Sequence, residues 1–452
     1  MSDARRPRDG MTLAVFLAGD SNYHHLGWRH PDAAVDAGSN LERWIEFARI
    51  AEAGKLDMLF IADQIAIVGG DNLAAIQNNS KVNRLDPLAL IAALAPLTRH
   101  IGLAATCATS YTEPYSVARM FASLDHISGG RAAWNCVTGG QKEEAQNFSM
   151  ERHAAHADRY ARANEFADVV MGLWESFEAD ALLYDKIGGR FFDPAKIHAL
   201  NHKGEHFAVR GPLNVSRAPQ GRPIVIQAGG SDATVEMGSR IADVVFTAQA
   251  AFEGARDFRD QVRQAAVARG RAADSVKVMP GLSVYVAATR AEAQAKFDAL
   301  HAMVEVADAI AGLGRLIEVD LSGYDPDAPM PDLEGNDLRM SGPGTFVRIG
   351  REKNLTLAQV AIQAKAAKNH CLVVGDVGDV ADLMEHWHCN GAADGFNLLP
   401  AIVPGSLRDF CEMVVPELQR RGLYQQDYAP GTLRDKLGLP YPGAAPARAA
   451  AQ

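Results

Sequence analysis

The sequence predicts an α/β fold, a (β/α)₈ TIM barrel with several insertions, and three observations favour it. Eight short apolar runs follow one another with helix-forming segments between them. The runs are apolar on both faces, as parallel strands covered by helices must be. No Gly-x-Gly-x-x-Gly follows the first run, which disfavours the alternative, a doubly wound sheet.

The expected strands are short runs that end in a turn or a polar residue. In chain order they cover 12–19, 57–63, 101–107, 131–138, 223–230, 243–249, 276–287 and 394–400. In a barrel the carboxyl ends of all eight meet at one face, where active sites are built. That face is therefore where functional residues are expected.

The helices between the strands carry their own start and stop signals. A helix over 40–53 is expected to begin with a capping box of Ser39 and Glu42 and to stop at Gly54. The next is expected to begin at Asp86, a good N-cap followed by proline. The long helix after the fourth strand is expected to bury one apolar face, made of Phe166, Val169, Val170, Leu173 and Phe177.

Four segments do not fit a minimal barrel and are rich in Gly, Asn, Asp or Pro. They lie near 64–85, 139–155, 179–222 and 312–370. We interpret residues 1–440 as one domain with these insertions rimming the active face, because barrel sites are built from the loops after strands. The last residues, 441–452, are of low complexity and are expected to be disordered.

Composition excludes several classes of partner. The chain has 452 residues with 45 basic and 55 acidic side chains, a formal charge of −10. This acidic balance argues against nucleic acid and anionic membrane as partners. Five cysteines without a Cys-x-x-Cys pair indicate a reducing compartment. No apolar run is long enough for a signal peptide or a membrane span, so a soluble cytoplasmic protein is expected.

Polar residues stand at several expected strand ends. Asp63 ends the second strand, Thr106 lies at the end of the third and Asn135 near the end of the fourth. One strand-end aspartate can merely cap a loop. Several polar residues at the same end of neighbouring strands favour a binding site.

The segment after the fifth strand has the features of an anion site. Gly229, Gly230 and Ser231 join that strand to a helix, and glycines there let the backbone approach a ligand while the helix start offers free N–H groups. An ordinary capped turn would look the same. His156 and Tyr160 share one helix face near the active end and could both bond a phosphate, although a solvated helix face is the plainer interpretation.

The loop after the first strand suits an anionic or aromatic ligand. His24, Trp28 and His30 are its candidate substrate contacts. No metal site is expected, because no Asp or Glu stands at ligand spacing here. A second weak cluster of His386, His388 and Cys389 is interpreted as a helix end. A Ser-His-Asp triad has no support, since no Gly-x-Ser-x-Gly occurs.

Several longer stretches together resemble one enzyme family over nearly the whole chain. They read GWRHP, KLDMLFIADQ, SLDHISGGRAAWNCVTG, HADRYARANEF, GPLNVSRAPQGRPIVIQAGGS, GAADGFNLLP and TLRDKLGL. With these motifs the chain resembles the bacterial luciferase-like flavin monooxygenases, and among them the nitrilotriacetate and dibenzothiophene-sulfone monooxygenase (component A) group. It departs from the dibenzothiophene branch in having Gly-Ser rather than Leu-Ser after QAG, which leaves the substrate open.

The resemblance implies a bound FMN and a homodimer or homotetramer. Carried over by position, the flavin contacts fall on Asp63, Thr106, His156, Tyr160 and Ser231. Asn135 and Gly230 are added from their place in the sequence. Ser231, His156 and Tyr160 would hold the phosphate. Asp63, Thr106 and Asn135 would line the isoalloxazine ring.

The resemblance also implies the chemistry. An NAD(P)H-dependent flavin reductase would supply FMNH₂, which with O₂ would give a C4a-hydroperoxyflavin that transfers one oxygen atom to a small organic substrate. The substrate could be a xenobiotic, an aminocarboxylate or an organosulfur compound, and no residue is assigned as general base. Two alternatives remain: a deazaflavin-dependent dehydrogenase on the same fold, and a non-catalytic flavin-binding barrel.

Overall fold

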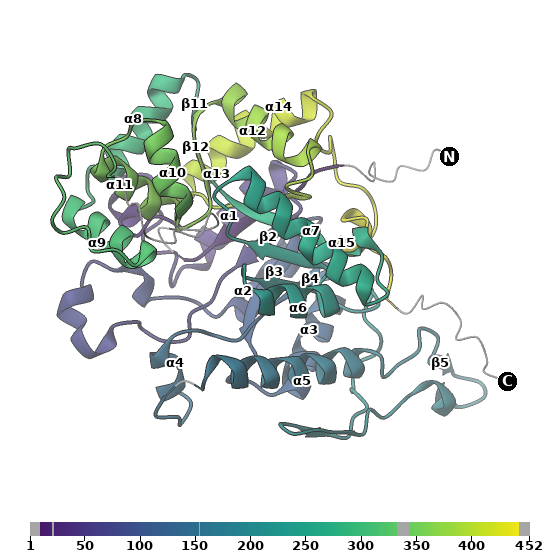
Figure 1. Ribbon diagram of the computed structural model, residues 1–452. Helices are drawn as coiled ribbons and strands as arrows, with labels where there is room; N and C mark the ends of the chain where they lie inside the picture. The colour runs from purple at the N-terminus through teal and green to yellow at the C-terminus, as the bar shows by residue number, and fades with distance from the viewer. Residues whose placement is uncertain (1–9, 20–21, 153, 332–343, 443–452) are drawn as a thin grey trace.

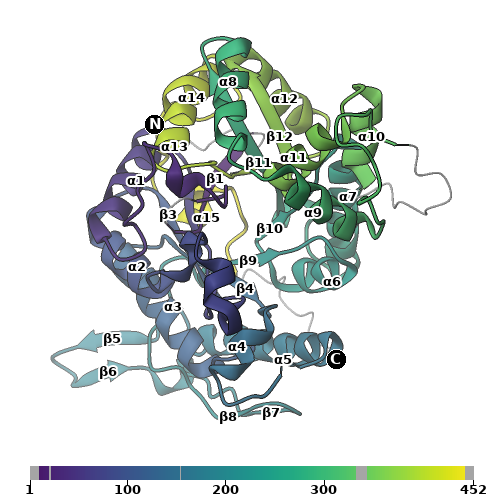
Figure 2. The ribbon, with the colours of Figure 1, turned by 90° about the vertical axis from the view of Figure 1, so that its left-hand side faces the viewer.

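The computed structural model describes residues 10–19, 22–152, 154–331 and 344–442 (Figure 1). Its centre is a ring of eight parallel strands surrounded by helices, with further elements attached at both ends of the ring (Figure 2). Most of the tail expected to be disordered, 443–452, lies outside the described residues.

The eight ring strands all fall on the predicted runs. They are β1 (Thr12–Leu17), β2 (Met58–Ile61), β3 (Gly102–Ala108), β4 (Ala132–Val137), β9 (Ile224–Ala228), β10 (Val244–Thr247), β11 (Lys277–Ala287) and β13 (Gly395–Leu398). Neighbours in this order are paired in parallel, and β13 closes the ring on β1. The predicted barrel is confirmed.

A ninth strand joins this sheet outside the ring and was not predicted. β12 (Cys371–Asp376) pairs with the far half of β11, beginning with Leu282 opposite Cys371. β11 is eleven residues long, so its first part belongs to the ring and its last part extends past β13 to meet β12. The overhang exists only because β11 is longer than its ring neighbours.

The helices cover the outside of the ring. Their bounds are α1 (Leu41–Ala53), α2 (Pro87–Leu94), α3 (Pro114–Ser128), α5 (His156–Trp174), α6 (Asp232–Ile241), α7 (Phe252–Ala268), α8 (Arg290–His301), α12 (Val377–Cys389), α13 (Gly405–Asp409) and α14 (Val415–Arg420). A π-helical turn, Phe410–Val414, joins α13 to α14. No helix among the described residues has the length and apolar character needed to cross a bilayer.

Two predicted details of the helices are wrong. The N-cap of α1 is Asn40, whose Oδ1 accepts the Glu42 N–H at 3.0 Å, so Ser39 and Glu42 do not form a capping box. α5 ends at Trp174, and Phe177 lies beyond it in a β-bridge with Ile197. Both errors concern the residue at which a helix begins or ends. Neighbouring residues of similar helix-end propensity cannot be distinguished from the local sequence pattern. The Asp86 cap of α2 is confirmed.

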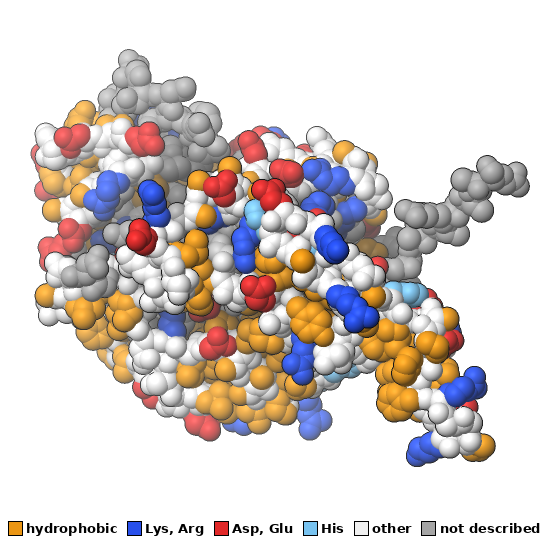
Figure 3. Space-filling view, turned by 90° about the horizontal axis from the view of Figure 1, so that it is seen from below, with side chains coloured by type: hydrophobic (Ala, Val, Ile, Leu, Met, Phe, Trp, Pro, Cys, Tyr) orange, Lys and Arg blue, Asp and Glu red, His pale blue; other side chains and the backbone are white. Residues whose placement is uncertain are grey.

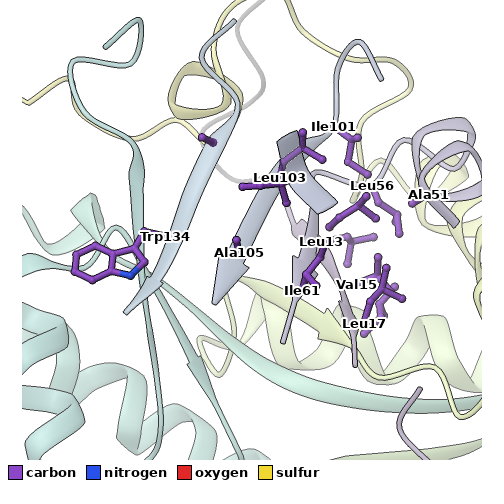
Figure 4. Packing of buried hydrophobic residues seen from close by; sticks show 14 of the residues in the cluster. Leu13, Val15, Leu17, Ala51, Leu56, Ile61, Ile101, Leu103, Ala105 and Trp134 are labelled. Atoms are coloured by element: carbon purple, nitrogen blue, oxygen red, sulfur yellow. The ribbon is translucent and has the colours of Figure 1, made fainter. Parts of the chain in front are cut away.

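The layer between strands and helices forms the main core (Figure 4). Leu13, Val15 and Leu17 of β1 and Leu103 of β3 are buried there. Trp134 of β4 is the largest fully buried side chain, and its Nε1–H donates to the Cys107 carbonyl at 3.0 Å. Burial of this apolar surface, at about 25 cal/mol per Å², holds the helices on the ring.

A C-terminal segment closes the amino end of the barrel. Helix α15 (Leu433–Lys436) places Leu433 in the apolar cluster inside the ring. Buried Arg434 donates to both carboxylate oxygens of Asp243, which also pairs with Arg222 at 2.7 Å. Burial alone would raise the pKa of Asp243, but the two guanidinium groups hold it below its usual value. With this end plugged, ligands have to enter at the opposite face.

Three insertions hold two 3₁₀ turns (Gly70–Ile76 and Ser80–Val82), α4 (Lys142–Gln146), and α9 (Val306–Ile317), α10 (Gly344–Glu352) and α11 (Leu357–Ala367). The first two follow β2 and β4 and therefore lie at that opposite face. The third follows α8 and reaches the same face through α9 and α11, which share a cavity with His25 of the loop after β1. Residues 332–343 of the last lie outside the described residues.

The insertion 179–222 begins at the amino end of the barrel, whereas the sequence analysis expected it to rim the active face. It carries two hairpins, β5 (Leu182–Asp185) with β6 (Arg190–Phe192) and β7 (His202–Lys203) with β8 (Ala208–Val209). It follows a helix rather than a strand and therefore starts at the amino end of the barrel. There Gln220 donates to the carbonyl of Ala132, the first residue of β4, at 3.0 Å.

Candidate active site

The predicted strand-end residues lie on adjacent strands of the ring. Asp63 follows β2, Thr106 is in β3 and Asn135 in β4, and these strands are consecutive neighbours with β9 next. Thr106 and Asn135 are directly paired in the sheet register. The barrel topology thus brings together side chains that are 29 to 72 positions apart in the sequence.

Thr106 and Asn135 form a short hydrogen-bond chain inside the carboxyl end of the ring. Asn135 Nδ2 donates to Thr106 Oγ1 at 2.9 Å, and Thr106 Oγ1 donates to the Ile61 carbonyl at 2.9 Å. Both side chains are buried. Asn135 Oδ1 is also buried, and among the described residues it has no hydrogen-bond partner. A buried acceptor without a partner is costly, so this atom suits a ligand donor.

Asp63 is half-buried beside these residues and has an altered acidity. Its Oδ1 accepts the Gln64 N–H at 2.8 Å. Burial raises the pKa of Asp63 to about 6, the Gln64 N–H opposes this, and the carboxylate of Asp86 adds to it. Asp63 borders a cavity of about 430 Å³ together with Lys81. A carboxyl group that changes its protonation near neutral pH can carry a proton at a reaction site.

The turn after β9 has the geometry expected of the glycine segment. Gly229 has φ +147°, and a Cβ there would lie 2.3 Å from Thr234 Oγ1, so only glycine fits. Ser231 is the N-cap of α6, with its Oγ accepting the Thr234 N–H at 3.4 Å. Gly230 and Ser231 are exposed, and the helix start is accessible to an anion.

The start of α5 lies on the same face as the start of α6. His156 is the first residue of α5, and half-buried Tyr160 lies one turn further on. The two helices are joined side by side: Arg240 of α6 forms an ion pair with Asp168 and donates to Asn164 Oδ1 at 2.9 Å. Both helices follow ring strands, so both begin at the carboxyl face.

The predicted substrate residues of the loop after β1 are separated from one another. His24 is buried, and its ring lies edge-on to His301 with centroids 4.7 Å apart. Burial, then the nearby His301, lowers the pKa of His24 to about 2. Trp28 Nε1 donates to the Asn78 carbonyl at 2.9 Å, and Trp28 lines a cavity of about 370 Å³. His30 Nδ1 accepts the Asp32 N–H at 3.2 Å, outside that cavity's lining.

The described residues hold no group of three or more His, Cys, Asp or Glu that could bind a metal ion. His386, His388 and Cys389 lie at the end of α12, as interpreted from the sequence. Asn390 Nδ2 donates to His386 Nδ1 at 3.1 Å, and His388 Nδ1 donates to the Ala393 carbonyl at 3.2 Å. These side chains complete a helix end.

An aromatic group inside the ring was missed by the sequence analysis. Phe16, Phe60 and Phe246 lie with their ring centroids 5.5 to 5.9 Å apart, and His370 stacks on Phe246 at 5.3 Å. A Cβ on Gly281 would lie 2.1 Å from His370 Nδ1, so the glycine makes room for this ring. The alternation of inward residues along the strands could have identified the phenylalanines. Nothing local marks His370, which precedes the unpredicted β12.

Comparison with known proteins supports one family. Residues 23–394 match the family described as luciferase-like monooxygenase. The chain is 44% identical to nitrilotriacetate monooxygenase component A of Aminobacter aminovorans, covering 94% of this chain and 96% of that protein. It is 42% identical to N-acetyl-S-(2-succino)cysteine monooxygenase of Bacillus subtilis, covering 95% and 97%. For dibenzothiophene-sulfone monooxygenase of Rhodococcus erythropolis the identity is 37%, covering 96% and 97%.

Solved structures agree. DmoA from Hyphomicrobium sulfonivorans superposes with a TM-score of 0.83 and 33% identity, covering 95% of this chain and 92% of that one. Riboflavin lyase, solved with modified FMN and riboflavin, gives a TM-score of 0.79 and 35% identity, covering 96% and 97%. An F420-dependent secondary alcohol dehydrogenase reaches only 0.56 at 15% identity, covering 89% and 98%, and that likeness shows the fold alone.

Proposed function

The chain belongs to the luciferase-like monooxygenase family and is a flavin-dependent monooxygenase, and from this premise we propose that it uses reduced FMN bound at the carboxyl face of the barrel. O₂ is the co-substrate, and one of its atoms enters a small organic molecule. The likeness to a riboflavin lyase solved with modified FMN supports FMN as the flavin. The distant dehydrogenase offers no comparable support for a deazaflavin.

The phosphate of FMN would lie at the two helix starts. The exposed Gly230 and Ser231 offer the free N–H groups of α6 and a hydroxyl. His156 and Tyr160 stand at the start of the neighbouring α5. Together they supply the cationic, hydroxyl and backbone donors that a phosphate binds.

The flavin ring would lie over the ends of β2, β3 and β4, against Asp63, Thr106 and Asn135. One observation carries this placement: Asn135 Oδ1 is buried with no partner among the described residues, while its amide is fixed on Thr106. The ring edge of a flavin has an N–H donor that fits such an acceptor. The bound flavin would supply the oxygen-transfer chemistry itself.

The protein's own part is to orient the ring, exclude water and handle protons. The aromatic group of Phe16, Phe60 and Phe246 keeps the inside of the ring apolar. Asp63, with its pKa raised to about 6, can hold or release a proton at its free carboxyl oxygen. The insertions at the carboxyl face would cover the site during the reaction. We propose that residues 1–440 work as this one domain.

Other proteins are needed for turnover. A separate NAD(P)H-dependent flavin reductase would supply FMNH₂, consistent with a relative named as a component A. A homodimer or homotetramer is proposed because apolar side chains gather on a projecting arm (Figure 3). The β5–β6 hairpin exposes Tyr184, Ile187 and Phe191, and a second copy of the chain would cover them. All five cysteines are free, which supports a cytoplasmic location.

A coupled assay tests the proposal. A flavin reductase supplies reduced FMN, and O₂ uptake is compared with peroxide release over a panel of aminocarboxylates and organosulfur compounds. The expected result is O₂ uptake that depends on this protein, with less peroxide when a substrate is present. Substrate turnover that continues without O₂ would contradict the monooxygenase and favour a dehydrogenase.

A further inference from the structure

A cavity bordered by basic side chains lies across the barrel mouth from the expected phosphate site. Two adjoining lobes of about 370 and 330 Å³ share His25, Asp308 and Lys365, and they are walled by the loop after β1, α9 and α11. In the ring, β1 and β13 stand opposite β4 and β9. This cavity, named here the basic cavity, is therefore separate from the helix starts that would hold the phosphate.

Lys368, at the end of α11, is the central cation of the basic cavity. Its ammonium donates to the Tyr23 carbonyl at 2.9 Å and lies 4.4 Å from the centre of the Tyr23 ring. It forms no ion pair with the described residues, and its side chain lines the 330 Å³ lobe. The pKa of Lys368 is well below its usual value because of removal from water, then because of the nearby Lys81 and Arg84. A bound anion would oppose the repulsion from Lys81 and Arg84 and favour the charged form of Lys368.

Two further basic groups face the same space. Lys365 lies one helical turn before Lys368 and lines both lobes. Burial lowers the pKa of Lys365, and Asp308 partly opposes this. Burial, followed by Lys365 and Lys368, lowers the pKa of His25 to about 4. The two lysines thus disfavour protonation of His25, and a bound anion beside them would favour their charged forms.

One layer of aromatic rings separates Lys368 from the inside of the barrel. Tyr23, under the Lys368 ammonium, lies edge-on to Phe16 with centroids 6.1 Å apart and edge-on to His370 at 5.8 Å. Those rings belong to the group inside the ring of strands. Lys81 interacts with Lys368 and also lines the cavity that Asp63 borders, so the basic cavity adjoins the expected flavin site.

We propose that the basic cavity binds the substrate, and that the substrate carries two or more carboxylate groups held by Lys365 and Lys368. The inference rests on the proposed monooxygenase function and adds the chemical class of the substrate to it. Two lysines three residues apart on a helix project to the same side, which suits two anionic groups of one small molecule. A single flavin phosphate is the other source of anionic groups, and the experiment separates the two.

The experiment measures binding to the protein loaded with oxidised FMN. Nitrilotriacetate and citrate serve as tricarboxylate probes, and the neutral triamide of nitrilotriacetate is the control ligand. Lys365→Met and Lys368→Met remove one charge each, while Lys368→Arg keeps it. Lys353→Met is the matched control protein, because Lys353 is an exposed lysine of the same insertion that lines neither lobe.

The wild type is expected to bind at least one tricarboxylate about 10-fold or more tightly than the triamide. Each Met variant should lose roughly 10- to 100-fold in that affinity, the loss of one charge-assisted bond, whereas Lys368→Arg and Lys353→Met should keep most of it. Added salt should weaken binding to the wild type more than to the Met variants. The affinities for FMN and riboflavin should stay in the same ratio in every variant.

Three results would overturn the inference: equal binding of triamide and both tricarboxylates by the wild type, unchanged tricarboxylate binding in both Met variants, or a loss of FMN affinity without a loss of riboflavin affinity. The last would assign the lysines to the flavin phosphate. Because no turnover is involved, tricarboxylate binding without O₂ uptake would contradict the proposed function and leave this site standing.

Discussion

Asn135 donates its side-chain amide to Thr106 Oγ1 at 2.9 Å, across two paired strands of the barrel. This bond decides which atom of Asn135 is left for a ligand, namely the buried Oδ1, which has no partner among the described residues. Thr106 is fixed in turn by its bond to the Ile61 carbonyl. The acceptor is thus oriented before any ligand arrives, so little conformational entropy is lost when a ligand binds.

Replacing Asn135 by leucine tests this acceptor. Asn135→Leu should weaken the binding of FMN and of riboflavin by about the same factor, roughly 5- to 10-fold. One hydrogen bond of about 1 kcal/mol to the flavin ring is lost in both cases. Thermal unfolding should shift little, since Thr106 keeps its bond to Ile61. Flavin fluorescence titration measures both affinities. A loss confined to FMN would mean that Asn135 contacts the phosphate end.

The raised pKa of Asp63, about 6, predicts a dependence of stability on pH. The folded protein holds the Asp63 proton more tightly than the unfolded chain, so this contribution is present below about pH 4 and is lost as pH rises through 6. Asp63→Asn should therefore raise the free energy of unfolding at pH 8 by about 1–3 kcal/mol relative to wild type. Denaturant unfolding at pH 4 and pH 8 measures it. An equal effect at both pH values would contradict the assignment.

Ser231 is expected to act at the phosphate and at the helix start together. Ser231→Ala should weaken FMN more than riboflavin, because only FMN carries the phosphate, and should destabilise the protein by about 1 kcal/mol through loss of the N-cap. Ser231→Gly is the matched control, since glycine keeps most of the cap stability but lacks the hydroxyl. Parallel losses for FMN and riboflavin would place the phosphate elsewhere.

Arg434 is expected to affect folding and not flavin binding. Arg434→Met removes one partner of the buried Asp243 and should destabilise the protein by about 3 kcal/mol or more. Arg420→Met is the control, because Arg420 is exposed and water screens its ion pair with Glu417, so its loss should change stability little. The flavin affinity of the folded Arg434 variant should match wild type. A changed affinity would mean that the C-terminal segment at the amino end of the barrel influences flavin binding at the carboxyl face.

The barrel strands could be predicted because each must be buried on both sides, which leaves a short run of apolar residues in the sequence. β12 was not predicted because it pairs only with the part of β11 that extends past the ring. That extension depends on the length of β11, which composition does not determine. The insertion 179–222 was misplaced because its composition resembles that of the rim insertions. It follows helix α5, so it starts at the amino end of the barrel.

The site could be predicted in part for the same reason. Asp63, Thr106 and Asn135 were identified by their place at strand ends, which the topology brings together. His370 and Lys368 could not be identified from the sequence. Their contacts with Tyr23 depend on how the chain between α9 and β12 packs over the carboxyl face of the barrel. Long-range packing of this kind leaves no periodic signal in the sequence.

The most direct test is a crystal structure of the protein with FMN. The phosphate is expected within hydrogen-bonding distance of Ser231 Oγ at the start of α6, and the flavin ring is expected to place a donor on Asn135 Oδ1. FMN bound at the amino end of the barrel, or at the mouth with its phosphate on Lys368, would contradict this expectation.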